Sequence, residues 1–431
     1  MNRQTPAIKA RVRRDLATLE AAREIQVALL TGGADEQYAY GLATSLISKR
    51  PTLEIVGNDA LDCPEFHGQD GVTFLNLRGD QRPSASLFTK VSRIAAYYAK
   101  LVRYAAVARP RIFHILWNNK FEFFDRTLLM LYYKARGKKI VLTAHNVNAG
   151  ARDGNDSLLN RLTLKIQYRL ADHIFVHTER MKRELIDNFG PDEPRVTIIP
   201  FGIYDSVHNT SLTVSEAKRR LGILEGEKTL LFFGNIAPYK GVEYLVAAFR
   251  NILARQENYR LVIAGRPKSC EAYWRGIREA IRSEVDTGRI LLRAEFIPDE
   301  EMEVYFKAAD VLVLPYRHIF QSGILFLGYS FGLPVLAADV GSLKDDIVEG
   351  QTGFIFRPED PADLEKTLER YFASDLYGDL NNQRKLIRDY ASERHSWDVV
   401  ARMTMDVYAG LLRIAPPKES INRDIASTPS T

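Results

Sequence analysis

Short, almost continuously apolar runs alternate along the whole chain with longer stretches of helical periodicity. In the first half these runs are residues 25–30, 53–58, 73–77, 111–117, 139–145, 173–178 and 196–201. After a polar stretch from Gly202 to Ser215 the series restarts at 228–234, 259–265, 289–296, 310–316, 333–339 and 353–358. Strands that are apolar on both faces and alternate with amphipathic helices are typical of parallel sheets built from βαβ units. The pattern predicts an α/β protein with two Rossmann-like, doubly wound parallel-sheet domains.

The same pattern divides the chain into segments. We expect a polar N-terminal extension, two Rossmann-like domains, a closing C-terminal helix and a tail that is disordered by composition, at residues 1–22, 23–205, 206–395, 396–415 and 416–431. The N-terminal stretch has no apolar core of a signal peptide, and no run of about eighteen apolar residues follows. We therefore expect a cytoplasmic protein without a membrane span.

Composition and charge narrow the choice of partners. The 431 residues carry a net charge of +5 and two cysteines, Cys63 and Cys270, that form no CxxC pair. The eight histidines show no metal-ligand spacing, so we expect no metal site. Residues 1–205 hold 30 basic and 22 acidic side chains, and no acidic residue lies between Asp80 and Glu122. This asymmetry predicts an anionic partner and leaves acidic lipid, nucleic acid and a phosphorylated substrate open.

One helix carries much of that basic charge. In residues 87–105 one face holds Leu87, Val91, Ile94, Tyr98, Leu101 and Ala105, and the other holds Lys90, Arg93, Lys100 and Arg103. Such a helix either packs on the core with a solvated basic face or contacts an anionic membrane or a lipid-diphosphate acceptor. No nucleic-acid-binding module accompanies it, so we expect no nucleic-acid partner.

Candidate ligand-binding residues follow the ends of predicted strands, where parallel sheets bind ligands. Gly32 and Gly33 form a turn after residues 25–30, and Lys240 ends the loop that follows residues 228–234. Gln321, Ser322 and Gly323 stand at the start of a helix, whose free N–H groups favour an anion. Taken one at a time, the glycines could form an ordinary tight turn, Lys240 could be solvated, and the helix start could be purely structural. The Lys240 loop and the helix start together indicate a site that clamps a diphosphate between them. Asp345 and Asp346 are interpreted as charges at the start of a helix.

The order of motifs in the second half makes a family resemblance visible. The chain has G-x-x-x-P-Y-K-G before an apolar helix, then E-M-E-x-Y-F-x-x-A-D-V-L-V-L-P-Y, S-G, F-G-L-P-V-L-A, D-V-G-S and E-G-x-T-G-F. Over residues 228–375 this resembles the C-terminal half of family 4 glycosyltransferases, and the N-terminal half is similar through Gly32–Gly33, L-T-A-H-N-V and A-D-H-I-F-V-H-T-E-R-M-K-R-E-L. The resemblance implies the GT-B fold, with two domains facing across a cleft, and metal-independent transfer from a sugar nucleotide without a cofactor.

The resemblance also assigns roles to individual residues. It implies that Lys240 holds the donor diphosphate and that His145 faces the donor sugar, both as catalytic residues. Gly32 and Gly33 match the glycine loop at the reacting centre, and Ser322 with Gly323 matches the helix start that holds the distal phosphate. The first domain would take the acceptor, a glycan or lipid-linked glycan, and the second the nucleotide sugar. From the same resemblance we expect transfer of a hexosyl group with retention of the anomeric configuration. We also expect a role in surface or extracellular polysaccharide synthesis.

Two departures from the family pattern leave an alternative open. Asn235 stands where the family has an arginine, and Ile319 and Leu327 stand where it has a pair of glutamates, in a subgroup with Q-S-G. Phosphate binding should then depend more on Lys240, and Gln321 should contribute to donor recognition. A catalytically degenerate homologue that serves as a binding or scaffold protein is the alternative. An epimerase of the same architecture would need carboxylates in the cleft, and none stands out.

Overall fold

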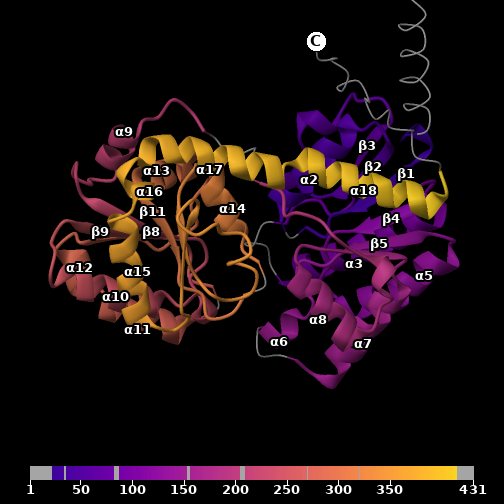
Figure 1. The fold of residues 1–431 in the computed structure, drawn as a ribbon. Coiled ribbons are helices and arrows are strands. Elements are labelled where there is room, and N and C mark those ends of the chain that lie inside the picture. The colour runs from indigo at the N-terminus through magenta and orange to yellow at the C-terminus, as the bar shows by residue number, and fades with distance from the viewer. Residues whose placement is uncertain are drawn as a thin grey trace, which may run out of the picture.

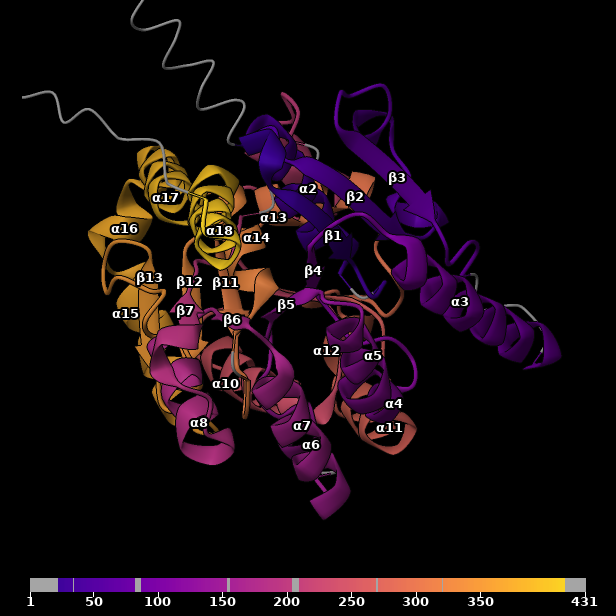
Figure 2. The ribbon, with the colours of Figure 1, turned by 90° about the vertical axis from the view of Figure 1, so that its right-hand side faces the viewer.

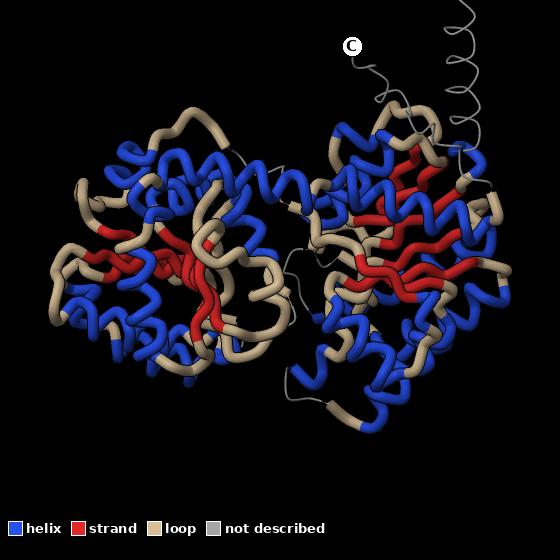
Figure 3. The backbone as a smooth tube through the Cα atoms, in the orientation of Figure 1, coloured by secondary structure: helices blue, strands red, loops and turns tan. Residues whose placement is uncertain are grey.

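The computed structural model describes residues 22–33, 35–81, 87–152, 156–203, 209–268, 270–319 and 321–414. The predicted extension, apart from residue 22, and the tail at 416–431 lie outside the described residues. The chain forms two α/β halves, each with a central sheet enclosed by helices (Figures 1 and 3). This confirms the predicted pair of Rossmann-like parallel-sheet domains; the exact domain limits stay predictions.

The first sheet is formed entirely by parallel strands, in the order β3-β2-β1-β4-β5-β6-β7. The strands are β1 (Gln26–Leu30), β2 (Thr52–Gly57), β3 (Val72–Asn76), β4 (Ile112–Ile115), β5 (Lys139–Thr143), β6 (His173–Val176) and β7 (Val196–Ile198). Each overlaps one of the apolar runs predicted as strands, and β2 and β3 begin one residue before theirs. The central strands are buried along nearly their whole length, because helices cover both faces of the sheet.

The second sheet is also parallel throughout, in the order β10-β9-β8-β11-β12-β13. The strands are β8 (Lys228–Phe233), β9 (Tyr259–Ala264), β10 (Ile290–Arg293), β11 (Val311–Leu314), β12 (Val335–Ala338) and β13 (Gly353–Phe356). In both sheets successive strands are added first on one side of the first strand and then on its other side. The change of side falls between β1 and β4 in the first sheet and between β8 and β11 in the second. Ligands bind at such switch points in doubly wound sheets.

Helices connect the strands. They are α2 (Glu36–Ser48), α3 (Leu87–Val107), α4 (Glu122–Phe124), α5 (Met130–Ala135), α6 (Ala149–Arg152), α7 (Leu158–Leu170), α8 (Glu179–Phe189), α9 (Val214–Arg220), α10 (Val242–Leu253), α11 (Glu271–Ala280), α12 (Arg282–Asp286), α13 (Asp299–Ala308), α14 (Gly323–Ser330), α15 (Pro361–Phe372), α16 (Asp375–Gly378), α17 (Leu380–His395) and α18 (Trp397–Leu412). Short turns are η1 (Asp59–Leu61), η2 (Pro64–Phe66), the π-helical η3 (Asp125–Leu129), η4 (Glu193–Arg195) and η5 (Pro238–Lys240).

The amphipathic helix predicted at 87–105 is α3, but its predicted apolar face is buried only in part. Leu101 and Ala105 are buried against the sheet, as a core-packing helix requires. Val91, on the same predicted face, is 65% exposed, because the first turns of α3 run out beyond the sheet (Figure 2). The second half of α3 therefore fits the core-packing interpretation and the first half does not.

The last helix joins the two halves. α18 continues from α17 of the second domain and packs against α2 of the first (Figure 1). The indole Nε1 of Trp397 donates to the carbonyl of Ile203 at 2.7 Å, and its ring fills the space beside Gly41 and Gly202. A side chain at either glycine would meet that ring within 2.5 Å. Trp397 thus fixes the crossing of the chain back to the first domain.

Replacing Trp397 by alanine should destabilise the protein by about 3–5 kcal/mol, because the buried ring leaves a cavity and the Ile203 carbonyl loses its donor. Urea unfolding followed by circular dichroism measures this loss. Trp397→Phe loses the hydrogen bond but keeps a smaller aromatic ring that fills part of the space, so its loss should be clearly smaller. An unchanged unfolding midpoint for the alanine variant would show that this contact does not hold α18 in place.

Candidate functional site

The residues predicted for the site lie after the carboxyl ends of central strands in both sheets. Gly32 and Gly33 follow β1, His145 follows β5, Lys240 follows β8 and Ser322 follows β11. Each strand is the first or a near neighbour of the first strand of its sheet, so the loops leave each sheet beside its switch point.

The glycine loop needs glycine at both positions. Gly32 and Gly33 have φ angles of +65° and +68°, which residues with a side chain rarely adopt. A Cβ atom on Gly32 would lie 2.3 Å from the carbonyl oxygen of Trp117, and one on Gly33 would lie 2.0 Å from a guanidinium nitrogen of Arg78. Asp35 caps the following helix by accepting from the N–H of Tyr38 at 3.0 Å. The loop therefore presents bare backbone between Trp117 and Arg78.

His145 is held by aromatic rings on two sides. Its imidazole stacks on the indole of Trp117, with ring centres 4.1 Å apart and planes 4° from parallel, and meets the edge of Tyr38 at 4.6 Å. Its Nδ1 lies 3.1 Å from Nε2 of His177. Burial, and then the neighbouring imidazoles of His177 and His114, hold the pKa of His145 well below its usual value. The ring is therefore neutral near pH 7.

The hydrogen bonds of His177 fix which nitrogen of His145 carries the proton. Nδ1 of His177 lies 3.2 Å from the Ile199 carbonyl, which can only accept, so this nitrogen is protonated. Burial lowers the pKa of His177 to about 4, so its Nε2 is an acceptor and receives the Nδ1–H of His145. Nε2 of His145 then carries a lone pair, and it has no hydrogen-bond partner within the described part of the chain. His145 thus offers an oriented acceptor.

In the second domain a tyrosine links the two predicted phosphate-binding elements. Nζ of the buried Lys240 donates to the Tyr316 hydroxyl at 2.6 Å and lies 3.9 Å from the centre of its ring. The same hydroxyl is 3.2 Å from Oγ of Ser322, the residue that precedes α14. The Ser322 side chain makes no capping hydrogen bond to α14. The arrangement places a cation, a hydroxyl and the first N–H groups of a helix together, which suits an anion.

Gly234 and Asn235 lie next to this group. Gly234 has a φ angle of +103°, and Ile324 of α14 lies 3.4 Å from the position that a Cβ atom would take there. The loop after β8 and the start of α14 are therefore in contact. Asn235 is exposed. Because Asn235 carries no charge, Lys240 is the cation of the loop at 234–241.

Gln321 lies beside a carboxyl group with an unusual pKa. Both polar atoms of its side chain are buried and, among the described residues, make no hydrogen bond of ordinary geometry. Burial raises the pKa of Asp346 to about 7; the Gln321 amide opposes this shift and Asp345 adds to it. Oδ2 of Asp346 is likewise buried and unpartnered within the described chain. Unpaired buried polar groups are costly, and a ligand hydroxyl would satisfy them.

The interpretation of Asp345 and Asp346 as helix charges is wrong, because residues 341–345 form turns and Asp346 lies in a bend, with no helix following. The Tyr329 hydroxyl donates to the carbonyl of Asp346 at 2.9 Å, and the N–H of Val348 donates to Oγ1 of Thr352 at 2.9 Å. These bonds satisfy the backbone outside a helix. Ile319 and Leu327, at the family's glutamate positions, are 9% and 4% exposed, so these side chains belong to the core.

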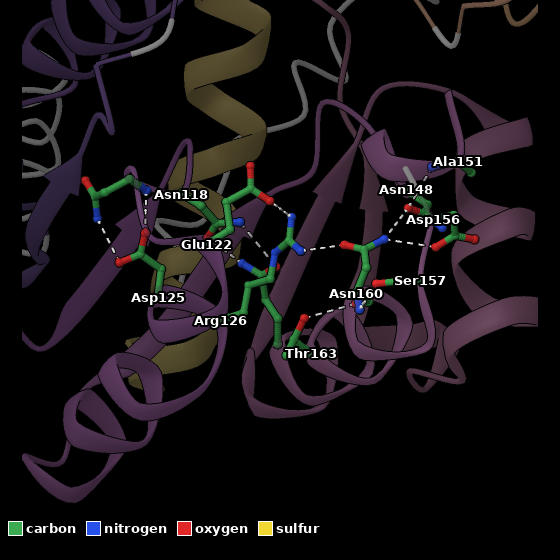
Figure 4. Close-up of polar contacts among 12 residues, drawn as sticks. Asn118, Glu122, Asp125, Arg126, Asn148, Ala151, Asp156, Ser157, Asn160 and Thr163 are labelled. Carbon is green, nitrogen blue, oxygen red and sulfur yellow. Dashed lines mark hydrogen bonds and ion pairs between the residues drawn. The ribbon is translucent and has the colours of Figure 1, made fainter. Parts of the chain in front are cut away.

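A pocket of about 250 Å³ adjoins His145 on the first domain, lined among others by Asn118, Arg126 and Gln167. Arg126 is 5% exposed; it pairs with Glu122 and donates to Oδ1 of Asn160 at 2.8 Å (Figure 4). Asn160 in turn donates to Asn148 at 2.9 Å and to Asp156 at 3.0 Å. The network ties the loop after β4 to α6 and α7, and so holds the wall of the pocket.

Three residues of the site escaped the sequence analysis: Trp117, His177 and Tyr316. The sequence held a signal for two of them, His177 and Trp117, in their positions after neighbouring strands. β5 pairs with β6 so that Thr143 faces Phe175, which places His145 and His177 side by side two residues further on. Trp117 likewise follows β4 beside β5. Tyr316 had no comparable signal, because its role depends on the side-chain position of Lys240.

No group of three or more metal-ligating side chains occurs within the described residues. Among these residues, too, no helix is long and apolar enough to cross a membrane.

Comparison with known proteins agrees with this architecture. Residues 21–206 match the family described as Glycosyltransferase Family 4, and residues 227–374 match Glycosyl transferases group 1. An uncharacterized glycosyltransferase of Methanocaldococcus jannaschii is 23% identical over 385 residues, which are 85% of this chain and 92% of that protein. HepE of Anabaena, solved in complex with UDP and glucose, superposes with a TM-score of 0.68 at 14% identity, over 89% of this chain and 100% of its own.

A further relative is the D-inositol 3-phosphate glycosyltransferase of Acidothermus cellulolyticus, 25% identical over 249 residues, or 56% of this chain. The chain spans about half the length of this relative, 54%. Because glycosyltransferase family models match both domains and the two-domain fold is shared with HepE, the protein is a glycosyltransferase of the GT-B type.

Proposed function

We propose that the protein transfers a hexosyl group from a nucleoside-diphosphate sugar to an acceptor hydroxyl, without a metal ion or other cofactor. The observation that carries the proposal is the chain of contacts from Lys240 through Tyr316 to Ser322. A fixed cation, a hydroxyl and helix N–H groups stabilise the charge that develops on a departing diphosphate. HepE, whose fold the chain shares, is solved with UDP and glucose, which supports a donor of this class.

In this proposal the first domain binds the sugar and the acceptor. Nε2 of His145 accepts a hydrogen bond from a donor-sugar hydroxyl, and Gly32 and Gly33 let the reacting groups approach the backbone. The acceptor oxygen bonds to the anomeric carbon as the bond to the diphosphate breaks, and the acceptor proton passes to the leaving diphosphate. Attack from the face that the diphosphate leaves retains the anomeric configuration.

The acceptor belongs, in this proposal, to surface or extracellular polysaccharide synthesis on the cytoplasmic side of the membrane. A glycan or lipid-linked glycan is the acceptor class, and residues 87–105 provide contact with an anionic membrane. The basic excess of residues 1–205 and the exposed start of α3 support this.

The experiment that tests the proposal is calorimetric titration with UDP, GDP and ADP in EDTA, followed by the matching nucleotide sugar. We expect one nucleotide to bind without metal and its sugar to be turned over, with release of the nucleoside diphosphate. Binding without turnover would favour the scaffold alternative, which Asn235, Ile319 and Leu327 motivate. If none of the three binds at millimolar concentration, the diphosphate clamp is refuted.

A further inference from the structure

A cavity of the first domain has a volume of about 610 Å³ and opens beside the glycine loop. Gly32 lines it, and its other walls come from the segment after β3, the first half of α3 and the loop after β4. These segments follow the carboxyl ends of strands that lie close together in the sheet. The cavity therefore adjoins the glycine loop, where the transfer is proposed to occur.

The walls of this cavity are strongly basic. Arg78, Lys90, Arg93 and Lys120 line it, against a single carboxylate, Asp80. That carboxylate contacts Arg93 at 3.3 Å. Lys90 and Lys120 form no ion pair with any described residue. Cations that outnumber the carboxylates of a concave site attract an anion.

Arg78 is held in place by neutral groups. Its guanidinium donates to Oδ1 of Asn119 at 3.2 Å and lies 4.8 Å from the ring centre of Tyr97. Asn119 is itself fixed by Asp125, which accepts from its N–H at 2.7 Å. Nε of Arg78 is buried and has no hydrogen-bond partner in the described chain. The charge of Arg78 is thus positioned over Gly33 but not compensated by a carboxylate in contact with it.

The outer rim of the cavity is apolar and exposed. Val91 of α3 lines the cavity and is 65% exposed; Phe88, one turn before it, and Phe121, next to the lining residue Lys120, are 84% and 55% exposed. The ring of Phe121 stacks on Tyr98 of α3 at 5.5 Å, so the two sides of the rim are in contact. Figure 2 shows this end of α3 reaching out beyond the sheet. Exposed large apolar side chains gathered around one opening indicate an apolar ligand.

We propose that this cavity is the acceptor subsite and that it takes a hydroxyl-bearing acceptor carried on a phosphate or diphosphate group. The cations bind the phosphate, the glycine loop receives the hydroxyl, and the rim receives an alkyl chain attached to the phosphate. That the bound molecule is an acceptor rests on the proposed transferase function. The anion site itself rests only on the cavity.

Binding of dodecyl diphosphate below its micellar concentration tests the site without any turnover. Inorganic pyrophosphate supplies the charge without the chain, and dodecyl maltoside supplies the chain without the charge. We expect dodecyl diphosphate to bind, the maltoside to bind at least about tenfold more weakly, and bound nucleotide not to compete. If pyrophosphate binds as tightly as dodecyl diphosphate, the phosphate site stands and its natural source is a soluble phosphate ester. If the maltoside binds as well as the diphosphate, the proposal is overturned.

A matched pair of variants separates the cavity from general basic charge. Lys90→Gln with Lys120→Gln removes two cations that line the cavity, and Lys100→Gln with Arg103→Gln removes two exposed cations elsewhere on α3. We expect the first pair to weaken dodecyl diphosphate binding about tenfold or more and the second to have little effect. Equal losses in both pairs would refute the cavity. Nucleotide binding, measured in the same variants, should be unchanged; if the wild type binds dodecyl diphosphate but no nucleotide, the proposed function fails and the anion site remains.

Discussion

Replacing Lys240 by methionine should lower the rate of transfer from the nucleotide sugar by about 10²–10³-fold and weaken nucleoside-diphosphate binding by more than about tenfold. Methionine nearly keeps the volume of the buried side chain and removes its charge, so the loss measures electrostatics rather than packing. The effect is large because Asn235 carries no charge to share the role. Steady-state kinetics and calorimetry with the nucleotide that the wild type binds give both quantities.

Two further variants show whether the lysine acts through its contacts. Tyr316→Phe keeps the ring beneath Nζ but removes the hydroxyl between Lys240 and Ser322, so its loss should be intermediate. Lys366→Ala removes a lysine from the exposed face of α15 and serves as the control for net charge. Thermal unfolding of each variant checks that the domain is intact. If Lys240→Met binds the nucleotide as the wild type does, the phosphate does not lie at this lysine.

The sequence predicted the parts of the site that depend on local pattern. Glycines at Gly32 and Gly33, and the helix start at Ser322, are recognisable because a positive φ angle and a helix N-terminus restrict residue type locally. The strands were predictable for a similar reason, since a run buried on both faces is apolar throughout. His145 and Lys240 gained their roles from the family resemblance, and the structure adds the contacts that hold them.

The features that could not be predicted from the sequence depend on contacts between distant segments. Asp345 and Asp346 follow a turn, a place where a helix commonly begins, but hydrogen bonds from Tyr329 and to Thr352 stabilise a non-helical segment instead. The face of α3 is continuous in sequence, yet burial ends partway because the sheet ends beneath it. Tyr316 joins Lys240 to Ser322 through side chains that are 76 and 6 residues apart in the chain, a relation no local pattern contains.

The two proposed anion sites divide the work of the enzyme. The cluster of Lys240 and Ser322 would hold the diphosphate that leaves, and the cavity behind Gly32 would hold the phosphate of the acceptor. Two cationic sites in separate domains keep two anionic substrates apart while their reacting groups meet. The neutral His145 adds no charge to either site, which suits a group that only accepts a hydrogen bond.

Replacing His145 by alanine should lower kcat/KM for the nucleotide sugar by about 10²-fold while leaving nucleoside-diphosphate affinity unchanged, because its oriented Nε2 lone pair would contact the sugar alone. The partner His177 should act as a positioning residue. His177→Phe removes the acceptor of the His145 Nδ1–H, so kcat/KM should fall by about tenfold. His177→Gln, whose amide can donate to Ile199 and accept from His145, should restore most of the activity.

The protonation states of His145 and His177 can be measured, and that of His145 would not change in the His177 variants if His177 had only a structural role. His177 has its folded-state pKa lowered to about 4 from an unfolded value of 6.5, so the folded form with a neutral ring is favoured fully above pH 6.5 and loses stability as the pH falls from 6.5 toward 4. Between pH 6.5 and 8 nitrogen-15 spectra should therefore show both rings neutral and His145 protonated at Nδ1 only. In His177→Phe that preference should disappear, because either nitrogen of His145 can then carry the proton. A His145 ring protonated at Nε2 in the wild type would contradict the assignment, since the lone pair would then point at His177 and not at the sugar.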